Sequence, residues 1–363
     1  MINSGAALDT RTRVKSWIAL GIVYLVWGST YLAIRVGVEH LPPLLMAGTR
    51  YVIAGALLYP IGRRASAGAR GTTHGGARPG AKAWLACAVV GLLLLFAGNG
   101  GVTVAETRLP SGVAALLVAT VPLWMIVFAW PVQHQRITWR SAAGLLAGLG
   151  GVAILVGSAA SGRISGVLIV LGAAVAWGFG SVLGHRLPLP PQAMLAAAIE
   201  MLAGGAVLLA VAAGTGEFGR ARWASVPASS WLALAYLVGP GSILAFTAYG
   251  YALSRLPVTT VSTYAYVNPI VAVLAGIVIL GERFSWREGL GAVLVVASVA
   301  VILYRPRAGA GSARPRRAAR DGEHADSRGR EPGHPLRHPR EVDPVAVDGM
   351  TADSAPAACP ADR

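Results

Sequence analysis

The feature that most constrains this chain is a series of ten apolar runs, each long enough to cross a lipid bilayer as a helix. A bilayer core of roughly 30 Å requires about 20 apolar residues of helix. Only 13% of the 363 residues are charged, which is far below the usual share in soluble domains. The sequence therefore predicts an all-α integral membrane protein. The runs span 16–36, 42–61, 83–102, 111–131, 140–158, 164–184, 191–213, 230–252, 258–280 and 287–304.

The charges between the runs predict how the chain is oriented. Lys and Arg accumulate in cytoplasmic loops. With the N-terminus inside, twelve Lys/Arg flank the inner ends of the runs and seven flank the outer ends. This favours two cytoplasmic termini, with residues 1–15 as an N-terminal segment and the first run retained rather than cleaved as a signal peptide. Residues 305–363 are rich in Arg, Pro, Ala and Gly, and we expect a disordered cytoplasmic tail.

The net charge of +15 does not predict a nucleic-acid partner, because the basic residues lie mostly at the ends of apolar runs. The two cysteines, Cys87 and Cys359, form neither a disulfide framework nor a zinc motif. No glycine-rich phosphate-binding loop is present. We therefore expect no metal and no cofactor, and membrane lipid as the surroundings of the chain.

The second half of the chain resembles the first. Residues 108–144 and 255–291 share eight identities in 37 ungapped positions, including Arg-Leu-Pro, Pro122 with Pro269, and Trp-Arg. At an offset of 150, Trp27-Gly28 aligns with Trp177-Gly178. Each half holds five runs, an odd number, so the halves are predicted to be inverted repeats: 16–158 and 164–304. Inverted repeats are an architecture of secondary transporters, with the substrate site between the halves.

Two ionisable residues lie well inside apolar runs. They are Arg50 and Glu200, and the offset of 150 aligns them with each other. A charge at bilayer depth costs at least about 2.5–3.5 kcal/mol, so it usually faces a cavity or a partner. We predict that Arg50 holds an anionic group of a substrate and that Glu200 titrates, which leaves proton coupling open. The alternative is a structural ion pair or a side chain that reaches the interface.

Aromatic and amide side chains gather in the same runs and complete the predicted substrate cavity. Their rings can stack on a substrate or hold a cation, although ordinary packing explains any one of them equally well. Pro122 and Pro269 are predicted to break matched helices as kinks or hinges, because proline removes a backbone hydrogen bond. The cavity residues are Trp27, Tyr31, Arg50, Asn99, Trp124, Trp177, Glu200, Tyr249, Tyr264 and Asn268.

Two hypotheses other than transport stay open. Ser181 and His185 are four residues apart, as a serine hydrolase inside the membrane would need. No further Ser/His/Asp cluster supports that hypothesis, and we expect no enzyme. The second alternative is a membrane scaffold or sensor without transport activity, which would have a filled interior and an ordered tail.

The chain resembles the EamA family of the drug/metabolite transporter superfamily. The resemblance is carried by WGSTYLAIR (27–35), MAGTRYVIAG (46–55), GNGGVTVAETRLPSGVAALLVATVPL (98–123) and the segment 255–295 with its Asn-Pro and Gly-Glu-Arg. It covers about 16–304. The first half departs from the pattern, since His134-Gln135-Arg136 stands where the second half has Gly281-Glu282-Arg283. A paired role of that glutamate is therefore in doubt.

The resemblance implies a ten-helix carrier of the bacterial inner membrane that exports or takes up small metabolites, such as amino acids, or toxic organic cations. It also implies a cavity formed by the first four helices of each half, with the fifth and tenth outside. We therefore expect a gradient-driven exporter that works by alternating access. The substrate, the direction, the coupling ion and whether the chain forms a homodimer stay open.

Overall fold

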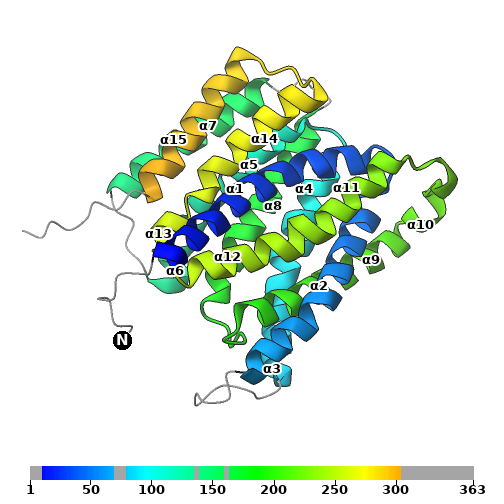
Figure 1. Cartoon of the computed structure of the whole chain (residues 1–363). Helices are drawn as coiled ribbons and strands as arrows, with labels where there is room; N and C mark the ends of the chain where they lie inside the picture. Colours follow the sequence, from blue (N-terminus) through cyan, green and yellow to red (C-terminus); the bar gives the residue numbers. More distant parts are fainter. Residues whose placement is uncertain (1–9, 69–78, 135–138, 159–162, 304–363) are drawn as a thin grey trace, which may run out of the picture. The chain divides into compact units, whose positions relative to one another are not determined.

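The computed structural model describes residues 10–68, 79–134, 139–158 and 163–303. These residues form helices and their connections, with no strand among them (Figure 1). The predicted disordered tail and most of the predicted N-terminal segment lie outside the described residues. The first helix begins at Thr10, six residues before the apolar run, because the basic residues that precede the run can continue the helix beyond the bilayer.

The helices follow the predicted runs closely. In the first half they are α1 (Thr10–Val38), α2 (Pro43–Gly68), α3 (Ala81–Gly91), η1 (Leu92–Gly100), α4 (Gly101–Ala105), α5 (Ser111–Val118), α6 (Val121–Gln133) and α7 (Trp139–Ser158). In the second half they are α8 (Ile164–Gly184), α9 (Ala193–Gly214), α10 (Glu217–Arg220), η3 (Trp223–Ser225), α11 (Ala228–Val238), η4 (Gly239–Leu244), α12 (Ala245–Leu253), α13 (Val258–Val261), α14 (Tyr264–Leu280) and α15 (Trp286–Leu303).

Seven helices of the described chain are long and apolar enough to cross a membrane. They correspond to the predicted runs 1 to 4 and 6 to 8. The other three runs also form helices, but α14 has 17 residues, and α7 and α15 begin with Trp-Arg. The count of ten spans therefore stays a prediction. The seven are Thr10–Val38, Pro43–Ser66, Ala81–Ala105, Ser111–Val132, Ile164–Gly184, Ala193–Gly214 and Ala228–Leu253.

Irregular segments occur at matched places in the two halves. The π-helical segments η1 and η4 begin at Leu92 and Gly239, which are 147 residues apart, the offset of the sequence repeat. A left-handed residue follows α6 at His134 (φ 55°) and α14 at Gly281 (φ 63°), again 147 apart. A π-segment arises where one extra residue is accommodated in a helix, and such segments are frequent at functional sites. Neither pair was predicted.

The helix breaks lie close to the predicted prolines without coinciding with them. The first break falls at Ala119–Thr120, and Pro122 occupies the first turn of α6, where its missing N–H costs nothing. The second falls at Ser262–Thr263, and α14 runs on through Pro269. Helix α14 therefore continues through Pro269, and the role of this proline as a kink or hinge stays a prediction. Its ring lies only five residues after the start of α14, so it disturbs the first turn alone.

The two halves pack through matched small residues. A Cβ atom added to Gly55 of α2 would lie 3.0 Å from the amide nitrogen of Leu202, and one added to Gly205 of α9 would lie 2.9 Å from that of Val52. Both pairs are related by the offset of 150. Gly28 meets Val271 and Gly178 meets Trp124 in the same reciprocal way. Matched residues thus make matched contacts across the halves.

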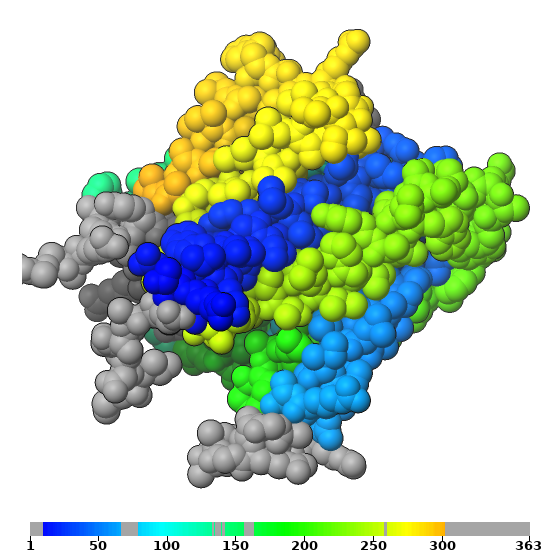
Figure 2. Space-filling model, viewed as in Figure 1, coloured from blue at the N-terminus to red at the C-terminus, as the bar shows by residue number. Residues whose placement is uncertain are grey.

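The first helix packs between two groups of helices from the second half of the chain. Figure 2 shows α1 lying between the segment of α14 and α15 on one side and α11 and α12 on the other. Helices α7 and α15 pack on each other through Gly151 and Gly291, whose Cβ positions face each other's carbonyl oxygens at 2.9 and 3.0 Å. Helices α7 and α15 therefore form a pair, and the other long helices surround the interior of the bundle.

The α2–α9 contact gives a first testable prediction. Replacing Gly205 by alanine places a methyl group 2.9 Å from a backbone nitrogen, and overpacking costs about 1–3 kcal/mol. We expect Gly205→Ala to lower the melting temperature of the purified protein in detergent. Gly172→Ala is the matched control, because nothing lies within 4 Å of its Cβ position and alanine favours a helix. Equal melting temperatures for both variants would contradict the close contact.

Candidate functional site

A cavity of about 280 Å³ lies between the two halves of the bundle. Its walls come from helices α1, α2, α5, α6, α8, α9, α12 and α14 and from η1 and α4. No described residue of α7 or α15 contributes to it. The interior is therefore not filled, and the fifth and last long helices lie outside the cavity, as the family resemblance implies.

The structure brings nearly all predicted cavity residues to this one space. Nine of the ten border the cavity, and both predicted prolines, Pro122 and Pro269, do so as well. These residues come from distant parts of the chain, so their convergence depends on the packing of the halves. The nine are Trp27, Tyr31, Arg50, Asn99, Trp177, Glu200, Tyr249, Tyr264 and Asn268.

Trp124 is the exception. It is absent from the cavity wall and packs its Cβ against Gly178 of α8. Its indole nitrogen is buried without a hydrogen-bond partner among the described residues. Pro122 and Met125 line the cavity instead, because they lie on the face of α6 that is turned inward.

Arg50 is the basic residue of the cavity wall. Its side chain is 5% exposed, and its Nε donates a hydrogen bond to Ser242 Oγ at 3.0 Å. The guanidinium carbon also lies 4.8 Å from the ring centre of Tyr51. Ser242 lies in the π-segment η4, so an irregular part of one half orients a charge from the other. The terminal guanidinium nitrogens have no ion-pair partner within the described ranges, and the group is available to an anion.

Glu200 is the acidic residue of the same wall. It projects from α9, whose backbone at this point meets Gly91 of α3 so closely that no Cβ fits there. Arg50 and Glu200 form no ion pair with each other in the part of the chain that the structure describes. The structural ion pair that was kept as an alternative is therefore not seen between these two residues in the described ranges. Two opposite charges lie in one cavity without neutralising each other directly.

An aromatic cluster forms another part of the wall. The ring of Trp27 lies 5.2 Å from Phe246, 5.3 Å from Tyr249 and 5.2 Å from Tyr264. The indole N–H of Trp27 donates to the Gly241 carbonyl oxygen at 3.2 Å, which fixes the ring. Aromatic rings arranged in this way can contact an apolar or cationic group of a ligand.

The amide side chains have structural partners within the cavity wall. In the amide orientation that satisfies its donors, Asn268 donates to the main-chain oxygens of Tyr264 (3.3 Å) and Tyr24 (3.2 Å), and so joins α14 to α1. Asn99 donates to the Leu94 carbonyl oxygen at 3.4 Å within η1. Ser181 also lines the cavity, but His185 is exposed at the end of α8, and no hydrogen bond joins the two among the described residues.

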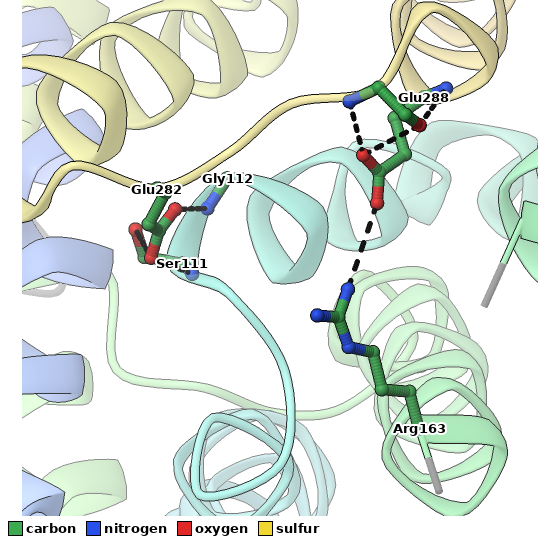
Figure 3. A network of polar contacts seen from close by, with 6 residues as sticks. Ser111, Gly112, Arg163, Glu282 and Glu288 are labelled. Carbon is green, nitrogen blue, oxygen red and sulfur yellow. Dashed lines mark hydrogen bonds and ion pairs between the residues drawn. The ribbon is translucent and has the colours of Figure 1, made fainter. Parts of the chain in front are cut away.

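The two ends of the cavity differ in packing. We call the end where α5 begins and α14 ends the Glu282 end. There the carboxylate of Glu282 accepts hydrogen bonds from Ser111 N (2.7 Å), Ser111 Oγ (2.9 Å) and Gly112 N (3.2 Å) (Figure 3). A carboxylate from the second half thus caps the first turn of a helix of the first half.

The two matched segments at the ends of the cavity also differ in how deeply their residues are buried. Residues 111–117 are all buried. Their counterparts at an offset of 147 are 258–264, and of those with described exposure, 260–264, only Val261 is buried. Gln135, the counterpart of Glu282, lies outside the described residues. The Glu282 end is therefore the tighter one.

Several residues of the site were not predicted. Thr30, Tyr51 and Phe246 line the cavity, and Ser242 holds Arg50. Tyr51 follows Arg50 directly, and Ser242 stands in a Gly-Pro-Gly-Ser segment, GPGS (239–242), that interrupts an apolar run. That interruption was the available signal, because glycine and proline inside a membrane helix often mark irregular backbone at a cavity.

The apolar spans and the interior cavity define a polytopic membrane protein. Its sequence matches the EamA-like transporter family twice, at residues 15–157 and 164–304. The chain belongs to this family.

Among its relatives is the uncharacterized inner membrane transporter YedA of Escherichia coli (strain K12), 41% identical over 289 residues, which are 78% of this chain and 89% of the relative. A probable terminal-alkyne amino-acid exporter of Streptantibioticus cattleyicolor is 27% identical and covers 79% of this chain and 93% of its own. A probable amino-acid metabolite efflux pump of Salmonella typhimurium is 24% identical, with 81% and 96% covered. A crystal structure with 24% identity shares the fold, with a TM-score of 0.52 over 80% of this chain and 97% of that one.

Proposed function

We propose that this protein is a gradient-driven secondary transporter that exports a small metabolite, an amino acid or a related compound, or a toxic organic compound, by alternating access. The observation that carries the proposal is the cavity between the two halves, which contains one cationic and one anionic side chain and an aromatic cluster. Arg50 would bind a carboxylate of the substrate, and Glu200 an ammonium group or a proton. One relative is named a probable amino-acid metabolite efflux pump and another a probable terminal-alkyne amino-acid exporter, and these names support this substrate class.

The same proposal includes the topology. Ten spans in two inverted repeats would place both termini in the cytoplasm of a bacterial cell, and the reciprocal contacts of Gly55 and Gly205 support such a two-fold relation. In this orientation the Glu282 end faces the outside. The tight packing of residues 111–117 supports a conformation that is closed on that side. Two similar packings of related halves are what alternating access requires.

The test is an export assay in living cells. Cells that express the wild type, Glu200→Gln or Glu39→Gln are exposed to a panel of toxic amino-acid analogues and organic cations, and intracellular accumulation is measured for each compound. We expect the wild type to lower the accumulation of one class of compound and Glu200→Gln to lose this effect at equal expression. Glu39→Gln removes an exposed carboxylate and is the matched control.

Other outcomes have clear meanings. If the wild type changes the accumulation of no compound, export is contradicted, and uptake or a scaffold remains. If Glu200→Gln protects as well as the wild type, export stands but the role of Glu200 is wrong.

A further inference from the structure

A carboxyl group is sealed into the protein at the Glu282 end. Glu106 is the residue directly after α4, one position beyond the membrane span Ala81–Ala105, and its side chain is 0% exposed. Neither carboxyl oxygen has a hydrogen-bond partner among the described residues. Arg35 lies beside it but donates its Nη1 hydrogen to the main-chain oxygen of Glu106, at 2.6 Å. The carboxyl group therefore lacks the donors that a buried carboxylate requires.

Charged and titratable groups from three elements face this carboxyl. Helix α1 contributes Tyr31 and Arg35, α2 contributes Arg50, and the segment after α14 contributes Glu282. Burial, and after it the negative charge of Glu282, raise the pKa of Glu106 well above its usual range, while Arg35 and Arg50 oppose this rise. The raised pKa agrees with the missing donors, because both favour the neutral acid.

The nearby arginine on the same turn does not supply the missing hydrogen-bond donor to the Glu106 carboxyl group. Arg108 follows Glu106 by two residues, but its Nη1 donates toward Ser165 Oγ at 3.4 Å on the side of α8. Arg163, which precedes α8, pairs with Glu288 at 4.0 Å (Figure 3). Both arginines thus have other partners.

We propose that Glu106 is a proton-binding site whose protonation holds the Glu282 end closed. The proposal rests on the proposed function, since only a transporter is expected to open and close this end. When the end opens, water reaches Glu106, its O–H bond breaks, the electron pair stays on the carboxylate oxygen, and the proton passes to the water on that side. Closing the end reverses the step. This site is separate from Glu200, which faces the cavity.

The direction of the pH effect follows from linkage. The closed state binds the proton more tightly than the open state, in which a hydrated glutamate has a pKa of about 4.3. Protonation therefore stabilises the closed state fully below the open-state pKa, and this stabilisation is lost as the pH rises through the closed-state pKa. Low pH on the side of the Glu282 end should keep that end closed, and high pH should release it.

The test measures the conformation of the full-length protein in lipid nanodiscs without substrate. Spin labels are placed on Thr107→Cys and Arg283→Cys, two exposed positions on opposite halves at the Glu282 end, in a background in which Cys87 and Cys359 are alanine. Double electron–electron resonance is recorded between about pH 5 and pH 9. We expect one short distance at low pH and a growing population of longer distances at high pH. In Glu106→Gln, a neutral isostere, the growth of the longer distance should be lost.

Two further variants show whether the carboxyl group of Glu106 itself causes the pH dependence. Glu106→Asp keeps a carboxyl group and should keep the pH dependence, whereas Glu39→Gln, at an exposed position near the same end, should leave the profile unchanged. A wild-type distribution that does not change with pH would overturn the proposal, and so would a Glu106→Gln profile identical to that of the wild type. Because the wild-type outcome needs no variant, poor folding of Glu106→Gln leaves the test decisive. Since no substrate is present, a failure to export any compound in cells contradicts the proposed function and not this result.

Discussion

Replacing Arg50 by methionine is expected to abolish export. In the proposed complex, Arg50 and the substrate carboxylate form a charge pair that is shielded from water. Loss of one partner from such a pair costs about 2–5 kcal/mol, so the apparent substrate affinity should fall by at least roughly 30-fold. Arg50→Lys should retain part of the activity, because lysine keeps the charge but lacks the planar group that binds a carboxylate through two nitrogens. The measurement is the concentration dependence of export of the compound class found in the cell assay, made with protein reconstituted in liposomes.

The stability of Arg50→Met should be close to that of the wild type. Ser242 Oγ also donates to the Leu237 carbonyl oxygen at 2.9 Å, so its hydroxyl keeps a partner when the arginine is removed. The variant moreover removes a charge whose insertion into the membrane is costly. Arg108→Met, at an exposed position outside the cavity, is the matched control and should export normally. A lowered melting temperature together with an unchanged substrate concentration at half-maximal rate would assign Arg50 a structural role instead.

Replacing Glu282 by alanine is expected to open the Glu282 end. The change removes three hydrogen bonds and leaves two amide groups at the start of the buried helix α5 without their acceptor. Such a loss costs about 2–4 kcal/mol, so the open population should rise by at least roughly 30-fold. The readout is the rate at which a membrane-impermeant maleimide, added on that side, modifies Ala115→Cys, a buried cavity residue.

Two controls accompany this measurement. Glu282→Gln keeps the size of the side chain but loses its charge, and should give an intermediate rate, because an amide oxygen is a weaker acceptor at a helix N-terminus. Glu39→Ala removes an exposed carboxylate near the same end and should not change the rate. A labelling rate in Glu282→Ala equal to that of the wild type would show that this contact does not hold the end closed.

The helical runs could be predicted because a bilayer imposes their length and apolar character on the sequence directly. The internal repeat could be predicted because Pro, Trp, Arg and Gly recur at constant offsets, whereas Leu and Ala would match by chance. The two charged residues of the cavity wall, Arg50 and Glu200, could be predicted because a charge inside an apolar run is conspicuous and costly. Trp124 was predicted to line the cavity but does not, because the sequence does not show which side of its membrane helix faces the interior.

What the sequence determined by itself was therefore the apolar helical runs, the recurrence of residues between the two halves and the identity of most residues around the cavity. Only the tertiary structure decided how the two halves differ. Gly281 and His134 adopt the same left-handed backbone conformation at matched positions. In the second half the next residue is Glu282, whose carboxylate accepts a hydrogen bond from Ser111, 171 residues earlier in the chain. This carboxylate lies directly against Gly276, which has no side chain to block it. The burial of Glu106 without a donor and the holding of Arg50 by Ser242 likewise depend on contacts between distant segments. Hydropathy and spacing act along the chain, while hydrogen bonding and desolvation depend on which groups the packed halves bring together.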